Sequence, residues 1–211
     1  MALQATHYRI ARDVLPHLSI TDTAEYYAGT LYPDSRYMSG LRRRLTHGDG
    51  CPKNPFAPGL SDFERGWAVH LQYDEVAGEA QKTLIPAGIL LDDGMGEGWR
   101  HFTVAKLVED EASCVTLGSE LAQIQLVHPT KVPNGENVEK VDAYYRLVRA
   151  LYENGPPTFE DHQRHYRGMI AEDIVQDLLA LYRAVREDPA YVAKAQAIYA
   201  QAYEVIRALR P

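Results

Sequence analysis

The stretch FERGWAVHLQYDEV, residues 63–76, decides the fold because it is typical of a largely apolar helix that also carries an imidazole and a carboxylate. His70 and Asp74 are four residues apart, so on a helix their side chains lie on one face. Gly66 lies one turn earlier on that face. Because glycine in a helix costs about 1 kcal/mol relative to alanine, it indicates close packing there or space that is kept open. Alternatively, His70 and Asp74 only form a hydrogen bond with each other, or this face of the helix is exposed to water.

The start of this helix is marked by its own residues. Ser61 followed by Glu64 fits a capping box, in which each side chain bonds to the other residue's backbone N–H. Pro86 and Gly88 interrupt the pattern and predict that the helix ends before them.

The remainder of the chain is also dominated by helical patterns. Further helices are expected over about 4–17, from Asp22 onward, 34–45, 97–127 (one helix, or two divided near Gly118), 138–152, from Thr158 onward, 169–185 and from Asp188 almost to the end. No strand alternation and no internal repeat is recognisable. The sequence therefore predicts an all-α, single-domain bundle of about seven to nine helices over residues 1–211.

Composition excludes several classes of protein. A net charge of −7 argues against an extended nucleic-acid-binding surface, which is normally basic. The two cysteines, Cys51 and Cys114, form no C-x-x-C pair, so neither a cysteine zinc site nor a disulfide framework is expected. The first residues lack the apolar run of a signal peptide, and no run approaches the ~20 residues of a membrane span. We therefore expect a soluble, cytoplasmic protein without a membrane span.

Three further polar residues join the opening pair as candidate metal ligands. His7 lies on the predicted first helix, Asp34 at a helix start after a proline, and His47 at a helix end before a glycine-rich loop. Imidazole and carboxylate are the ligands of zinc, iron, manganese and nickel. Each residue also has a simpler interpretation: a surface histidine, an N-cap, or a histidine favoured by a helix dipole.

The order of these motifs resembles the zinc-dependent phospholipase C group, which is related to the single-strand-specific nucleases. The similar segments are TH and IA near the start, then YPD, TH and GWAVHLQYD, within about residues 6–75. The resemblance implies a helical metal-dependent phosphoesterase. It implies that His47, His70 and Asp74 hold a first metal and that Asp74 bridges to a second, which also uses His7. It further implies that Asp34 binds the metal or accepts a proton from the attacking water.

The expected cofactor is a divalent metal, with zinc first and iron, manganese or nickel as alternatives. The metal site is expected within about residues 1–110, and a helical extension or interaction half within about 137–211. The expected substrate is a small phosphate ester, and the long C-terminal helices suggest a homodimer.

Three groups of polar residues have open roles. Lys106, Glu109 and Asp110, with His101 two turns before Glu109, could support the site, although such a run is more typical of a solvated helix face. The run Arg42–Arg44 could bind a substrate phosphate or be surface charge. His162 and His165, spaced i, i+3, form an alternative metal pair.

The favoured function is a metal-dependent hydrolase of phosphate esters. One alternative is an HD-type metal phosphohydrolase, although the nearest dipeptide, Asp161-His162, is in reverse order. The other alternative is a helical scaffold or binding protein with a structural metal or none, whose surface would use the tyrosines of the second half. These tyrosines are equally consistent with a packed core.

Overall fold

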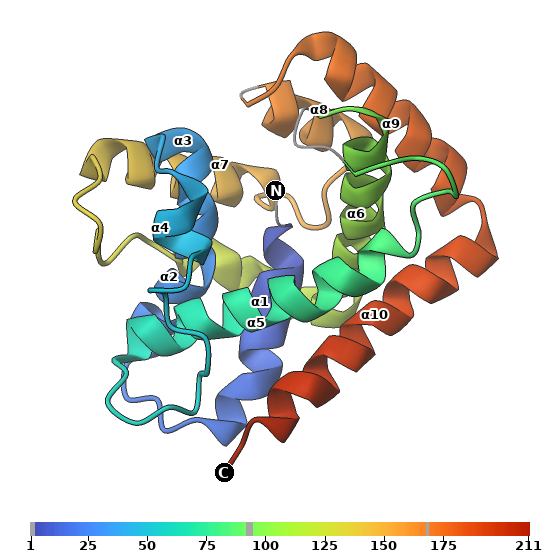
Figure 1. Cartoon of the computed structure of the whole chain (residues 1–211). Coiled ribbons are helices and arrows are strands. Elements are labelled where there is room, and N and C mark those ends of the chain that lie inside the picture. Colours follow the sequence, from blue (N-terminus) through green and yellow to red (C-terminus); the bar gives the residue numbers. More distant parts are fainter. Residues whose placement is uncertain (1–2, 92–94, 168) are drawn as a thin grey trace.

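The computed structural model describes residues 3–91, 95–167 and 169–211, and within these ranges every regular element is helical, which confirms the all-α class (Figure 1). The helices are α1 Gln4–Val14, α2 Thr23–Leu31, α3 Arg36–Ser39, α4 Arg43–His47, α5 Asp62–Lys82, α6 Glu97–Leu117, α7 Val138–Leu151, α8 Phe159–Arg167, α9 Glu172–Arg186 and α10 Pro189–Ala208. Three 3-10 segments join them, at Leu15–His17, Tyr32–Ser35 and Gly118–Leu126.

Helix α5 begins as its sequence predicts. The Ser61 hydroxyl accepts from the backbone N–H of Glu64, and the Glu64 carboxylate accepts from the backbone N–H of Ser61, at 3.3 and 2.8 Å. This capping box satisfies donors that the first helical turn leaves without partners. The helix then continues for 21 residues, through both His70 and Asp74.

Two glycines let α2 and α5 approach until their backbones touch. A Cβ atom on Gly66 would lie 1.9 Å from the carbonyl oxygen of Tyr26 on α2. A Cβ atom on Gly29 would lie 1.9 Å from the carbonyl oxygen of Phe63 on α5. Any larger residue at either position would force the two helices apart. Gly66 therefore serves close packing, the first of the two possibilities that its position suggested.

The prediction of one continuous helix over residues 34–45 is wrong. The chain forms a 3-10 turn at Tyr32–Ser35, then α3, and breaks at Gly40, whose φ of 76° is left-handed. Helix α4 starts afresh at Arg43. Over 97–127 the predicted division near Gly118 is confirmed: α6 ends at Leu117, φ of Gly118 is 52°, and a 3-10 segment follows.

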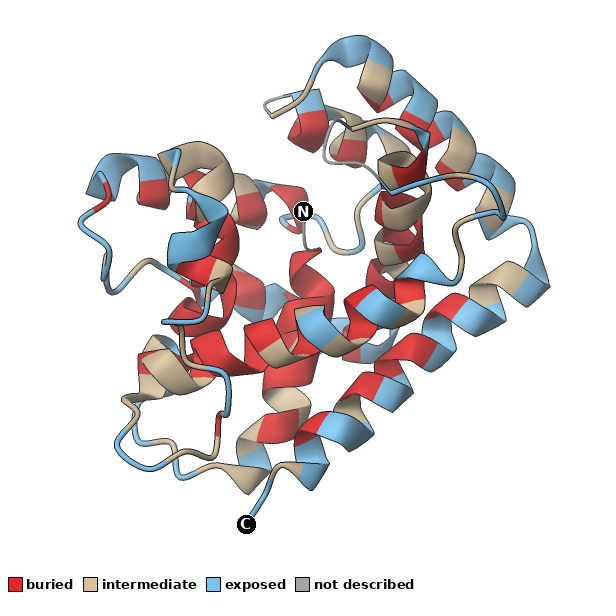
Figure 2. Ribbon diagram, in the orientation of Figure 1, coloured by how far each residue is buried: buried red, intermediate tan, exposed pale blue. Residues whose placement is uncertain are grey.

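Helix α1 lies at the centre of the molecule, crossed by α5, with α6 beside it (Figure 1). Its residues contribute to two apolar clusters, one with residues of α7 and one with residues of α5 and α10. Leu3, just before the helix, belongs to a third cluster with residues of α6 and α9. Figure 2 shows that α1, α5 and α6 are the most deeply buried helices, whereas α10 is buried along one side only. The expected site part and helical extension therefore share one packed interior.

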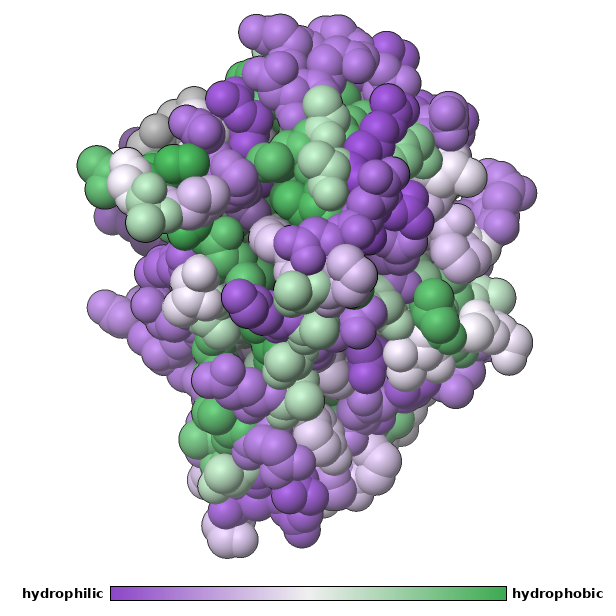
Figure 3. All heavy atoms as spheres, turned by 90° about the vertical axis from the view of Figure 1, so that its right-hand side faces the viewer, coloured by the Kyte–Doolittle hydropathy of each residue, from purple (hydrophilic) through white to green (hydrophobic). Residues whose placement is uncertain are grey.

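The tyrosines of the second half lie mainly in this interior rather than on a binding surface. Tyr144, Tyr145, Tyr152 and Tyr166 are all at most 1% exposed. The hydroxyls of the first three lie in hydrogen bonds with Gln4, Ala28 and Asp110, respectively. The side of the molecule formed largely by α9 and α10 is mostly hydrophilic, with separate apolar patches (Figure 3). Among the described residues, no helix combines the length and apolar character needed to cross a bilayer.

Candidate metal centre

The five predicted ligand residues come together from four parts of the chain. His7 comes from α1, Asp34 from the 3-10 turn after α2, His47 from the end of α4, and His70 and Asp74 from α5. Ligand atoms of His7, His70 and Asp74 lie within 4.8 Å of one another, as do those of Asp34, His47 and His70. The fold thus makes a single cluster from residues up to 67 positions apart in sequence, between His7 and Asp74.

The Asp74 carboxylate lies between the three imidazoles. Its Oδ1 is 3.4 Å from Nε2 of His7, and its Oδ2 is 3.5 Å from Nε2 of both His47 and His70. A tetrahedral ion bonded at about 2.0–2.1 Å to such atoms would separate them by roughly 3.3 Å. The observed spacing is longer than an ordinary N–H···O bond and close to the edge of a coordination polyhedron. The donor set therefore fits a transition-metal ion.

His70 is held with one ring nitrogen aimed at the cluster. Its Nδ1 lies 2.9 Å from the backbone carbonyl oxygen of Thr30, and since a carbonyl only accepts, Nδ1 carries the proton. Nε2 therefore presents a lone pair, and among the described residues it has no hydrogen-bond partner. A metal-binding histidine is typically oriented by a carbonyl in this way. The bond exists because Gly66 brings the end of α2 against α5.

The His7 ring stacks on the His70 ring, with centroids 3.8 Å apart and planes inclined by 11°. Burial, reinforced by the neighbouring His70, lowers the pKa of His7 to about 4. His7 is therefore neutral at pH 7 and able to offer a lone pair. Burial also lowers the pKa of His47, whose Nδ1 lies 2.8 Å from the Thr46 hydroxyl.

Both carboxylates of the cluster, the buried Asp34 and the partly buried Asp74, are ionised. Burial acts to raise the pKa of Asp34, but the neighbouring groups, His70 first among them, together outweigh it and lower that pKa. For Asp74, burial is likewise opposed, first by Lys106 and then by His70, which hold its pKa well below the usual value. Two anionic oxygens and neutral imidazoles are the form in which such side chains bind a metal.

A cleft of about 880 Å³ opens over the cluster, with Asp34, His47 and Asp74 in its wall. This is the size of a small-molecule site. Five basic side chains also line it, in a protein of net charge −7: Arg36, Arg43, Lys53, Lys82 and Lys106. Lys53 and Lys82 form ion pairs with Asp49 and Glu79, but in the described part of the chain the other three form none.

All three arginines of the predicted run are exposed; Arg43 lines the cleft, and Arg42 and Arg44 do not. Sequence reasoning missed Arg36, whose guanidinium lies 3.9 Å from the centre of the Tyr37 ring. The sequence feature that could have identified Arg36 is its position two residues after the candidate ligand Asp34.

The interpretation of 106–110 as a solvated helix face is wrong. Glu109 and Asp110 are 2% and 1% exposed, because α6 lies between α1 and α9 with this side inward. Asp110 accepts from the backbone N–H of Thr6 at 2.9 Å, which fastens α1 next to the ligand His7. Glu109 accepts from the Tyr73 hydroxyl at 2.9 Å, and burial raises its pKa to about 8. These carboxyls support the site rather than face water.

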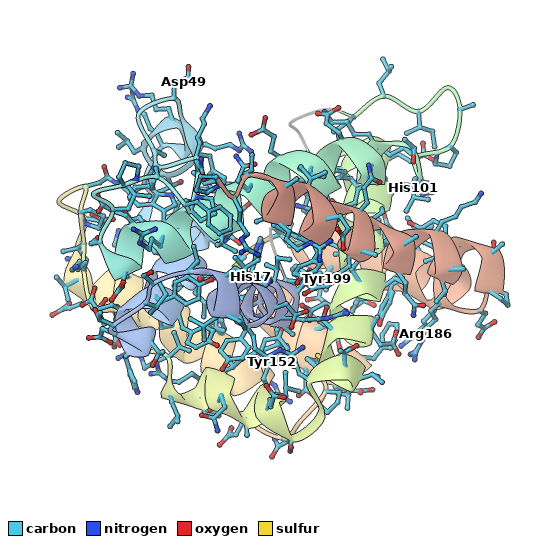
Figure 4. The ribbon with its side chains drawn as sticks, turned by 90° about the horizontal axis from the view of Figure 1, so that it is seen from below. His17, Asp49, His101, Tyr152, Arg186 and Tyr199 are labelled. Atoms are coloured by element: carbon cyan, nitrogen blue, oxygen red, sulfur yellow. The ribbon has the colours of Figure 1, made fainter. Side chains whose placement is uncertain are left out.

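His101 takes no part in the cluster. It lines neither the cleft nor the small cavity beside the cluster, and it lies far across the molecule from Asp49, which follows His47 by two residues (Figure 4).

The alternative metal pair in α8, His162 and His165, lacks a third ligand among the described residues. His162 and His165 are each 4% exposed. In the ranges that the structure describes, no carboxylate or thiol joins them in a potential metal-binding group. Asp161 instead caps α8 by accepting from the N–H and hydroxyl of Thr158 at 2.9 and 2.7 Å. The reversed Asp-His dipeptide is therefore a helix-start feature.

Comparison of the chain with protein-family models, with curated proteins and with solved structures gives no significant match. The resemblance over residues 6–75 accordingly stays a prediction based on the motifs alone.

Proposed function

We propose that the protein is a metal-dependent hydrolase of phosphate esters. The observation that supports this most is the convergence of three imidazoles and two carboxylates at the wall of a cleft that also holds unpaired cationic side chains. Such donors suit a divalent transition metal, zinc first, with iron, manganese and nickel as alternatives. The cleft is lined by carboxylates as well as cations, and its three basic side chains without an ion pair among the described residues, Arg36, Arg43 and Lys106, favour an anionic substrate over a peptide or sugar.

The position of the Asp74 carboxylate suggests how the ligands would be shared between two metal ions. Its two oxygens face different histidines, His47 and His70 on one side and His7 on the other. His47, His70 and Asp74 would hold one cation, and His7 with the other oxygen of Asp74 would hold a second. A bound divalent cation would polarise a phosphoryl oxygen and lower the pKa of a water to about 7.

Three further side chains of the cleft would bind and orient the ester. Arg36 and Arg43, both without an ion-pair partner among the described residues, would donate to phosphate oxygens in the forked geometry that guanidinium groups provide. Asp34 is ionised, lies beside His47 and His70, and borders the cleft. It would accept the proton of the attacking water, as a general base does.

The test compares wild type with Asp34→Asn on a chromogenic phosphomonoester and phosphodiester, after metal removal and after reloading. We expect hydrolysis only after reloading with metal, and a kcat in the loaded variant roughly 100- to 10,000-fold below that of the loaded wild type. Wild-type protein that carries its metal but cleaves neither ester would contradict the proposal. If the variant instead loses metal, Asp34 is a ligand rather than the base.

A further inference from the structure

Lys106 occupies a position that no other basic residue of the cleft shares. A small cavity of about 10 Å³, with room for about one water molecule, lies behind the ligands and is lined by His7, Asp74 and Glu109. Of the described residues, Asp74 and Lys106 line both this cavity and the large cleft. Lys106 therefore lies where the ligand cluster meets the space for a substrate.

The ammonium group of Lys106 is held in place without being neutralised. Its Nζ lies 4.6 Å from the centre of the Phe102 ring, one turn earlier on α6, in a cation–π contact. The residue is half-buried, and within the described ranges it forms no ion pair. By contrast, Lys82, which lines the same cleft, forms an ion pair with Glu79 at 2.5 Å. A half-buried cation without a counter-ion is costly unless something else supplies the negative charge.

The neighbours of Lys106 would not supply the missing negative charge once a metal ion is bound to the cluster. Lys106 acts on the carboxyl groups of Asp74 and Glu109. Burial raises the pKa of Glu109 to about 8, and the proposed metal would take up both oxygens of Asp74. An ammonium group beside a divalent cation is then repelled, unless an anion lies between the two. A phosphate group has oxygens enough to contact both.

We propose that Lys106 is a catalytic residue that donates from Nζ to a phosphate oxygen of the substrate. This inference rests on the proposed function and names the residue that neutralises the phosphate on the α6 side, opposite Arg36 and Arg43. Lysine binds phosphate as a compact charge with three donors. Its contact strengthens as negative charge grows in the transition state.

The test measures binding of inorganic phosphate to the metal-loaded protein by isothermal titration calorimetry, together with metal content and ester hydrolysis. Lys106→Met removes the charge and keeps an apolar chain over Phe102, Lys106→Arg keeps a charge, and Lys82→Met is the matched control. We expect Lys106→Met to weaken phosphate binding roughly 10- to 100-fold, the value of a charged hydrogen bond. Lys106→Arg should recover part of the loss, Lys82→Met should bind as wild type does, and all should hold wild-type metal.

Three results would overturn the inference: phosphate binding by Lys106→Met as tight as by Lys82→Met, loss of metal from Lys106→Met in step with loss of binding, or no phosphate binding by wild type. The second result would mean that Lys106 acts through Asp74. If phosphate binds in a Lys106-dependent manner but no ester is cleaved, the proposed hydrolysis fails while this phosphate contact stands.

Discussion

The cluster around Asp74 and the pair His162–His165 are two buried groups of histidines with opposite surroundings. Burial lowers the pKa of His7 to about 4, and it lowers those of His162 and His165 to about 4 and about 3. The first group includes carboxylates and opens to a cleft. The second is packed against rings: His162 lies 6.0 Å from Tyr182 and His165 lies 5.5 Å from Tyr166, between ring centroids.

From this difference we infer that burial of imidazoles would not by itself make a metal site. Each group also contains a ring nitrogen without a described hydrogen-bond partner, so that feature does not separate them either. What separates them is the anionic oxygen, which offsets the charge of a cation, and the open space in which a substrate can meet it. The predictions below test this distinction.

The largest expected effect separates the two groups by activity. His70→Ala should lower phosphoesterase activity by roughly 1,000-fold or more, because several kcal/mol of transition-state stabilisation depends on the metal. His165→Ala should keep both metal and activity and lose about 2 kcal/mol of stability through the cavity it leaves. Activity assays and thermal unfolding of both variants check this. A loss of activity in His165→Ala alone would reverse the assignment of the two groups.

The next effect tests how the cluster is assembled. Gly66→Ala should lower the free energy of unfolding by about 3 kcal/mol, because its Cβ would press on the backbone of α2. It should also weaken metal binding, since α2 carries the carbonyl that orients His70. Denaturant unfolding and metal titration measure the two effects.

Gly78→Ala on the same helix is the control for this substitution. Its nearest neighbour would be an atom of Phe102, 3.9 Å away, so we expect no loss and a gain of up to about 1 kcal/mol. Equal behaviour of the two variants would show that the close contact of α2 and α5 does not hold the site together.

The smallest expected effect is the pH dependence of stability that the pair His162–His165 contributes. The pKa of His162 is about 4 in the folded chain, whereas an unfolded histidine titrates near 6.5. Between these values the unfolded chain binds a proton that the native chain does not, so stability present above pH 6.5 is lost as pH falls. Each pH unit in this window costs up to about 1.4 kcal/mol. In His162→Phe the decline between pH 6.5 and 4.5 should be shallower, and an unchanged slope in denaturant unfolding would disagree.

The sequence was sufficient for the elements whose signals are local. The pair of Ser61 with Glu64 predicts the start of α5, and the i, i+4 spacing of His70 and Asp74 places both on one face. The order of short motifs also predicted which five residues converge, although their binding of a metal stays a prediction.

Features that depend on distant contacts were not predictable in the same way. Glu109 and Asp110 look like a solvated run because nothing local shows that α1 will cover them. The break at Gly40 depends on a left-handed φ that glycine permits but does not require. The role of Gly66 needs Gly29 on another helix, and Arg36 becomes a candidate only when the cleft forms.

Elemental analysis of the protein as isolated, with His70→Ala beside wild type, tests the central claim most directly. We predict one to two equivalents of a transition metal per wild-type chain, zinc first, and the loss of at least one equivalent in the variant. A wild-type chain that carries no metal, and takes up none when zinc, iron, manganese or nickel is added, would contradict the account.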